Sequence, residues 1–218
     1  MNLLPVLCWA VVAALAAAGA DPWLRRQLPE GSRLAGTWLQ VPVAAVLGGL
    51  AGLAPSLLEQ VTFAVLAVAG ALLVVVDYAD YRLPDVIVLP LYGVLAVLLT
   101  ATAWTQDRWP DLLRAGIVAV AMFVLYFVMA MFAPDLGFGD VKLAGVAGGF
   151  LGWFGIAEPV AGFLLAWVLM AVVGLVLLLL RRVGRKASLP FGPYLIAGAV
   201  LGALFGARMF PVLAGLTG

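Results

Sequence analysis

The sequence contains no histidine, and its 218 residues include a single cysteine, Cys8. Without histidine the chain has no Ser/His/Asp or Cys/His catalytic group, no imidazole metal ligand and no imidazole pH switch. One cysteine has no partner within the chain for a disulfide, and it cannot build a zinc cluster. Histidine- and thiol-based chemistries are therefore excluded, and we expect a protein that uses no metal and no other cofactor.

Charge is also scarce. Only 11% of the residues are charged, the net charge is +1, and no long block of like charge occurs. The electrostatic footprint of a nucleic-acid-binding protein is therefore missing, and no nucleic acid partner is expected. What the chain has in abundance is apolar side chains: 66% of the residues are hydrophobic and the mean hydropathy is +1.17. This composition predicts an integral membrane protein surrounded by lipid.

About 20 apolar residues cross the hydrocarbon as a helix, and about eight segments approach that length. With connectors this short, we expect an all-α, polytopic membrane helix bundle folded as one domain over residues 1–218. The first segment ends in a sequence similar to a signal-peptide cleavage site, but residues 1–10 lack Lys and Arg, so we interpret it as a retained helix. The predicted segments are Leu3–Ala20, Trp38–Leu58, Val61–Val76, Val86–Trp104, Leu112–Ala133, Val141–Ile156, Val160–Leu180 and Phe191–Val212.

The positive charges predict the orientation. Nine Lys and Arg residues lie in the odd-numbered connections, whereas the even-numbered ones hold only Arg108 and Arg114. Positive connections stay in the cytoplasm, so both termini are expected on the outer side. The cluster at residues 181–186 is interpreted as a topology signal and a contact for anionic lipid. The nine residues are Arg25, Arg26, Arg33, Arg82, Lys142, Arg181, Arg182, Arg185 and Lys186.

Two acids lie at the predicted cytoplasmic face. Asp77 ends the third segment and Asp140 precedes the sixth, and the hairpin between these segments returns the chain to the same face. Two carboxylates that meet in surroundings of low dielectric cannot both ionise cheaply, so one keeps a proton. The ionised carboxylate can then take a proton from water while the neutral one polarises an amide carbonyl. This is the chemistry of an aspartyl peptidase, although composition and topology alone leave other functions open.

Three ordered motifs make the prediction more specific. Asp77 stands eight residues before Asp85 in DYADYRLPD, Asp140 closes GFGD, and LPFGPY at 189–194 opens the last segment. Over roughly Val61–Gly206 the chain resembles the type IV prepilin peptidases, or leader peptidases, which are membrane aspartyl peptidases of the GxGD type. The resemblance implies that Asp77 and Asp140 are the catalytic pair. It also implies removal of the leader peptide from type IV prepilin or pseudopilin precursors at the cytoplasmic face of the plasma membrane.

Other residues in and near the motifs have two interpretations each. Lys142 either steadies the Asp140 carboxylate or anchors a helix end at the interface. Asp140 and Asp85 are also candidate helix N-caps, and Asp80 is expected to be a solvated loop residue. As residues that support the site or bind substrate we name Gly137, Gly139, Lys142, Pro190, Gly192 and Pro193. The last three either border the cleft or form an ordinary proline-containing first turn.

The chain also departs from the pattern of full-length bacterial members. These carry an N-terminal portion, often with two CxxC pairs for zinc, that is associated with methylation of the new pilin N-terminus. One cysteine cannot build that site, so we expect a short, peptidase-only form. No oligomeric state follows from the sequence.

Two other classes of function stay open. A transporter that uses the aspartates for proton coupling would have acids or broken helices near the middle of the membrane, which the sequence does not clearly show. A non-catalytic subunit of a pilus or secretion machine would have the same composition as the enzyme.

Overall fold

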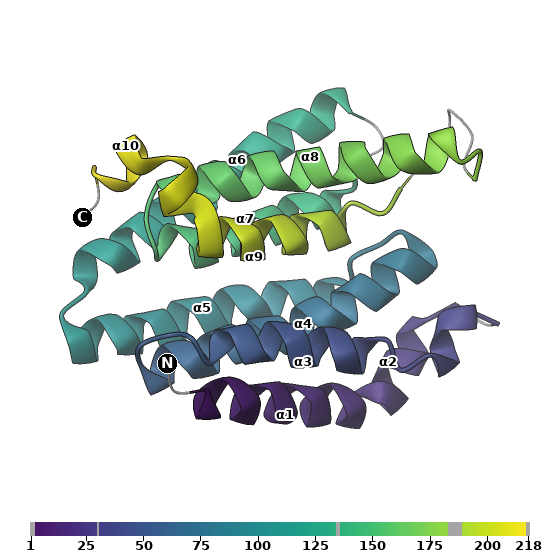
Figure 1. Cartoon of the computed structure of the whole chain (residues 1–218), viewed down its shortest axis with the longest axis horizontal. Coiled ribbons are helices and arrows are strands. Elements are labelled where there is room, and N and C mark those ends of the chain that lie inside the picture. Colours follow the sequence, from purple (N-terminus) through teal and green to yellow (C-terminus); the bar gives the residue numbers. More distant parts are fainter. Residues whose placement is uncertain (1–2, 30, 134–135, 183–188, 217–218) are drawn as a thin grey trace. The chain divides into compact units, whose positions relative to one another are not determined.

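The computed structural model describes residues 3–29, 31–133, 136–182 and 189–216, and within these ranges it contains helices and no strand (Figure 1). The chain divides into two compact units, Met1–Arg108 and Trp109–Gly218, which are described one at a time. The elements of unit 1 are α1 (Leu4–Gly19), α2 (Asp21–Gln27), the 3-10 turn η1 (Arg33–Gly36), α3 (Gln40–Ala51), α4 (Leu57–Asp80) and α5 (Asp85–Gln106). Those of unit 2 are α6 (Trp109–Phe132), α7 (Phe138–Gly152), α8 (Ala157–Leu179), α9 (Gly192–Met209) and α10 (Pro211–Ala214).

The predicted fold class, an all-α polytopic membrane protein, is confirmed. Each of the eight predicted segments contains one of the main helices. Within the described ranges, five helices are long and apolar enough to cross a membrane: α4, α5, α6, α8 and α9. Helices α1 and α2 make a sixth span if this pair, bent by 54°, is counted as one. With 12 and 15 residues, α3 and α7 reach only about 18 and 22 Å, short of the roughly 30 Å of hydrocarbon. The count of eight spans is therefore approximate.

Unit 1 is built on close contacts between small residues. Helix α1 packs antiparallel to α3, and both pack on α4. A Cβ atom on Gly48 would lie 2.9 Å from the Trp9 carbonyl oxygen, so the two backbones touch because this residue has no side chain. Helix α5 returns along α4, and Arg108 closes the hairpin with a 2.6 Å ion pair to Glu59 in the first turn of α4. An alanine cluster fills the space between α1, α3 and α4: Ala13, Ala17, Ala44 and Ala71.

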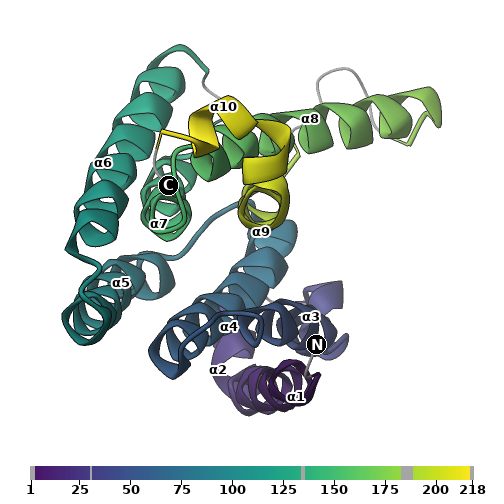
Figure 2. The same ribbon diagram turned by 60° about the vertical axis from the view of Figure 1, so that its left-hand side comes forward.

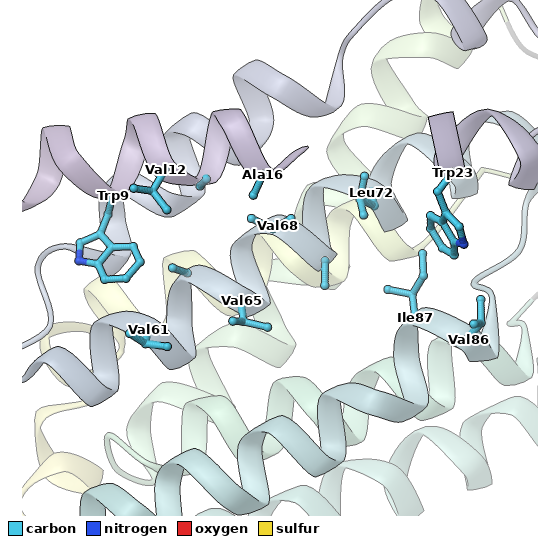
Figure 3. A pocket seen from close by; sticks show the side chains of 13 residues that line it. Trp9, Val12, Ala16, Trp23, Val61, Val65, Val68, Leu72, Val86 and Ile87 are labelled. Carbon is cyan, nitrogen blue, oxygen red and sulfur yellow. The ribbon is translucent and has the colours of Figure 1, made fainter. Parts of the chain in front are cut away.

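An apolar hollow of about 440 Å³ runs along α1 and α4 (Figure 3). Trp9 and Val61 lie at one end of the hollow, and Trp23, Val86 and Ile87 lie at the other. Its apolar walls suit hydrocarbon rather than a polar ligand. Because Trp23 belongs to α2 and Val86 to the start of α5, the connection after α1 and the connection after α4 lie at the same end of unit 1. The sequence predicts that these two connections share one face of the membrane. Their common end of unit 1 agrees with that prediction, and the face itself stays a prediction.

Unit 2 consists of two antiparallel pairs, α6 with α7 and α8 with α9, and α7 also packs against α8 and α9. Figure 2 looks nearly along α7, with α6 on one side and α9 on the other. A Cβ atom on Gly152 would lie 2.8 Å from the Val118 Cβ atom of α6, and one on Gly202 would lie 2.7 Å from the Glu158 carbonyl oxygen of α8. Since α7 and α9 both run antiparallel to α8, their N-termini lie at the same end of the unit.

At the opposite end of unit 2, Arg114 of α6 joins the end of α7 to the start of α6. Its Nε and Nη2 atoms donate to the Gly152 and Trp153 carbonyl oxygens, at 2.7 and 2.9 Å. Nη2 also donates to Asp111 at 2.8 Å. These bonds satisfy carbonyl groups that the end of a helix leaves without an intrahelical partner.

The glycine contacts predict a stability difference between two alanine variants. Gly202→Ala forces its new Cβ against the backbone of Glu158 and Gly162, whereas Gly116→Ala, also inside a helix of unit 2, has open space. We expect Gly202→Ala to lose about 1–3 kcal/mol of stability by overpacking. Gly116→Ala is expected to be neutral or slightly stabilising, because alanine is the better helix former. Thermal unfolding of the purified variants in detergent measures both, and equal melting temperatures would contradict the packing.

Candidate active site

Asp77 lies in the last turn of α4 and is buried, with 4% of its surface exposed. The two residues before it, Val75 and Val76, are completely buried, so Asp77 comes directly after a buried apolar part of the helix. The helix ends directly afterwards: the Tyr81 N–H donates to the Asp77 carbonyl oxygen at 2.9 Å, and Tyr81 takes a left-handed conformation with φ 53°. A buried acid at this end of a helix faces the negative end of the helix dipole, which disfavours a negative charge.

The two other acids of DYADYRLPD have different surroundings. Asp80 is the last residue of α4, is more exposed than Asp77, and forms an ion pair with Arg82. Pro84 occupies the N-cap position of α5, so Asp85 is not the N-cap but the first helical residue, at the positive end of the dipole. The spacing of eight residues thus covers the end of one helix, a tight turn and the start of the next.

Asp140 lies in the first turn of α7 and is 8% exposed. Its Oδ2 atom accepts a hydrogen bond from the Gly137 backbone N–H at 3.1 Å, and its own N–H donates to the Gly137 carbonyl oxygen at 3.0 Å. Gly137 is the N-cap, so the carboxylate caps the helix from the third helical position. In contrast to Asp77, Asp140 lies at the positive end of its helix, which favours the charged form.

Phe138 fixes the GFGD turn onto α6. Its ring packs edge-on against Phe123 and Phe127, with centroids 6.4 and 6.3 Å apart. The Lys142 Nζ atom lies 4.9 Å from the centroid of the same ring, a cation–π distance. Lys142 therefore packs over the motif, one turn after Phe138 and two residues after Asp140. A Cβ atom on Gly137 would lie only 3.3 Å from Asp140 Oδ2, which explains the small residue before this turn.

The LPFGPY segment forms the start of α9. Phe191 is the N-cap, and its carbonyl oxygen accepts from the Tyr194 and Leu195 N–H groups at 3.0 Å each. Gly192 begins the helix and Pro193 follows in the first turn, where the missing N–H costs nothing. The interpretation as a proline-containing first turn is thus confirmed for Gly192 and Pro193, whereas Pro190 precedes the N-cap. Because α7 and α9 start at the same end of unit 2, the segment shares that end with GFGD, and its role at a cleft stays a prediction.

Comparison with known proteins decides the family. Residues 64–207 match the type IV leader peptidase family, a range that includes Asp77, Asp140 and the segment 189–194. The chain belongs to this family. The match covers nearly the same part of the chain as the predicted range Val61–Gly206, so the predicted resemblance is confirmed. No solved structure matches.

Three curated relatives are each named prepilin leader peptidase/N-methyltransferase. The one from Burkholderia pseudomallei (strain 1026b) is 32% identical over 178 residues, which are 79% of this chain and 55% of the relative. The Pseudomonas putida protein is 29% identical over 138 residues, 62% and 46% of the two chains. The Legionella pneumophila protein is 28% identical over 149 residues, 67% and 51%. The chain thus spans about half the length of these relatives.

Within the described residues of this leader peptidase family member, no three acidic or cysteine side chains gather as a metal site requires. Chemistry without a metal stays a prediction from the residue types.

A polar cluster after α1 was not predicted from the sequence. Asp21 is buried and accepts from Arg25 Nε at 2.6 Å and from Gln40 Nε2 at 3.0 Å, which ties the start of α2 to the start of α3. This cluster lies at the same end of unit 1 as Asp77. In the sequence only the polar residues Asp21 and Gln40, each beside an apolar run, indicate it. Tyr126, a single tyrosine in the apolar α6, was missed as well.

The cap at Asp140 predicts that two substitutions differ in stability. Asparagine keeps an oxygen that accepts from the Gly137 N–H, whereas alanine leaves that donor without its partner. We expect Asp140→Ala to lose about 0.5–2 kcal/mol relative to Asp140→Asn. Melting temperatures of the two variants in the same detergent test this, and a variant pair with no difference would show that the cap contributes nothing.

Proposed function

We propose that this protein is a membrane aspartyl endopeptidase that removes the leader peptide from type IV prepilin or pseudopilin precursors, with Asp77 and Asp140 as the catalytic pair. One observation carries the proposal: two acids of the family's ordered motifs are each buried at a helix end, in opposite dipole environments. On this proposal the two units work as one peptidase domain, and the active site faces the cytoplasm.

The two environments suggest how the acids divide their roles. Asp140, with a backbone N–H donor at the positive end of α7, is the ionised member and takes a proton from the attacking water. Asp77, buried at the negative end of α4, keeps its proton and donates a hydrogen bond to the scissile carbonyl oxygen. The water oxygen bonds to the carbonyl carbon, and the C–N bond breaks as Asp140 returns the proton to the leaving nitrogen.

The position of the acids suits a substrate whose chain passes from the membrane into water at the bond to be cleaved. In the family, the precursor has a hydrophilic leader followed by an apolar helix, so its cleavage site lies at the membrane interface. Carboxyl groups at helix ends suit that depth, and the distribution of Lys and Arg supports the cytoplasmic interface. Gly137, Gly139 and Lys142 are proposed to shape the Asp140 turn. Pro190, Gly192 and Pro193 are proposed to border the cleft.

The other two functions have less support. A proton-coupled transporter favours acids near the middle of its spans, but every acid in the described helices lies in a first or last turn. A non-catalytic assembly subunit has no need of two buried acids placed in leader peptidase motifs. Both alternatives predict that precursor processing does not depend on the aspartates.

Asparagine variants test the catalytic pair. We expect Asp77→Asn and Asp140→Asn each to lower cleavage of a co-expressed type IV prepilin by at least about 100-fold, because each removes an acid or base from the reaction. Asp80→Asn, at the same helix end as Asp77 but paired with Arg82, is the matched control and is expected to cleave normally. The mass of the precursor measures processing. Normal cleavage by either Asp77→Asn or Asp140→Asn would exclude the proposed pair.

Thiol labelling tests the proposed orientation of both motifs. With Cys8 replaced by alanine, single cysteines are placed at the exposed residues Arg82, Arg182 and Gln106. We expect a membrane-impermeant maleimide to label Gln106→Cys in intact cells, and Arg82→Cys and Arg182→Cys only after permeabilisation. If Arg82→Cys and Arg182→Cys were accessible from opposite sides, Asp77 and Asp140 could not act together.

A further inference from the structure

A tyrosine hydroxyl is enclosed inside unit 2, among side chains that are otherwise apolar or aromatic. Tyr126 of α6 has 0% of its surface exposed. Its ring packs edge-on against Phe163 of α8 with centroids 5.8 Å apart, and lies tilted by 45° against Phe191, the N-cap of α9, at 5.9 Å. Trp167 of α8 closes the cluster, 5.0 Å from Phe191. A buried hydroxyl without a hydrogen bond costs about 1–3 kcal/mol, so this position calls for an explanation.

The hydroxyl has a neighbour that can only donate. The Trp167 indole N–H approaches the Tyr126 oxygen, although neither atom completes a well-aligned hydrogen bond within the described part of the chain. Indole Nε1 is a donor with no acceptor capacity, whereas a phenol both accepts and donates. If Trp167 donates to the oxygen, the phenolic proton is directed to another acceptor.

Helix register places Asp140 near this proton. Along the antiparallel α6 and α7, Gly152 lies against Val118 and Gly148 lies against Met122. One further turn brings Tyr126 opposite Ala144, and Asp140 follows on the next turn of α7, about 5.4 Å along the axis. The charge of Asp140 acts electrostatically on the Tyr126 hydroxyl.

No other described acid of unit 2 lies at this end. Asp111 and Glu158 lie at the opposite end, where Asp111 is paired with Arg114 and Glu158 packs against the last turns of α9. The basic groups of unit 2 lie at both ends of it. Lys142 of α7 lies over the Phe138 ring, while Arg181 and Arg182 follow the end of α8, and Arg208 lies at the far end of α9.

We propose that Tyr126 is a positioning residue for Asp140: its hydroxyl donates a hydrogen bond to the Asp140 carboxylate, directly or through the attacking water, and holds it ready to accept a proton. This inference rests on the proposed peptidase function. The aromatic cluster excludes bulk water and fixes the phenol, and the N-cap of the LPFGPY segment forms one of its walls. The segment at the start of α9 therefore contributes to the site through Phe191 as well as through its glycine and prolines.

Tyr126→Phe tests the proposal, because it removes the hydroxyl and keeps the ring. We expect cleavage of a co-expressed and then purified type IV prepilin to fall by about tenfold in kcat with an unchanged KM, the loss expected for a hydrogen bond to a charged group. The acidic limb of the pH–rate profile is expected to move to higher pH, because a donor to the ionised carboxylate is lost. Tyr92→Phe, the same change on α5 of unit 1, is the matched control. It is expected to leave kcat and the pH–rate profile unchanged.

Three outcomes decide the matter. The expected loss with the shifted acidic limb, at a melting temperature equal to that of the unchanged protein, supports the role. A normal rate in Tyr126→Phe overturns the inference, and a lower rate with an unmoved pH profile overturns it too, since a purely structural role would give that result. Asp140→Asn is measured in the same assay. If Asp140→Asn cleaves normally, the proposed function fails. If Asp140→Asn is inactive and Tyr126→Phe cleaves normally, only the role of the tyrosine is excluded.

Discussion

A carboxylate is costly in hydrocarbon, and this constraint governs where the chain keeps its acids. Each acid of the described helices lies within a turn of a helix end, where backbone N–H groups, basic side chains or the interface reach it. Of the five that are buried, four lie at helix N-termini, where the dipole stabilises them. The exception is Asp77, in the last turn of α4. These five are Asp21, Glu59, Asp77, Asp140 and Glu158. An acid kept where both burial and dipole disfavour its charge is a typical mark of a functional group.

Packing between small residues decides which helix ends lie together. Lipid tails are as apolar as the side chains, so helices associate in a membrane by close contact rather than by hydrophobic burial. In unit 2, Gly148 and Gly152 let α7 lie directly on α6, while Gly202 and Gly206 let α9 lie on α8. These contacts set the register that brings the starts of α7 and α9 to one end. The GFGD turn and the LPFGPY turn share that end because glycines far from both of them set the helix positions.

Much of the fold and of the candidate site follows from the sequence. Hydropathy predicts each main helix of the described ranges, and the spacing of the acids separates Asp77 from Asp80, which differ in burial. Hydropathy does not predict that α3 is too short to cross, since it reports composition and not where a helix ends. The N-cap at Pro84 was missed for a similar reason, because Asp85 has the better capping side chain.

The sequence by itself determined that the chain is an all-α membrane protein, that it carries the motifs of the leader peptidase family, and which two acids belong to those motifs. These properties depend on composition and on local spacing. Only the tertiary structure decided what each helix face touches: the Gln40 amide on Asp21, the Phe138 ring on α6, and the enclosure of Tyr126. A helix that is apolar all round has no hydrophobic stripe to predict its rotation, so the neighbours of its side chains follow only from packing.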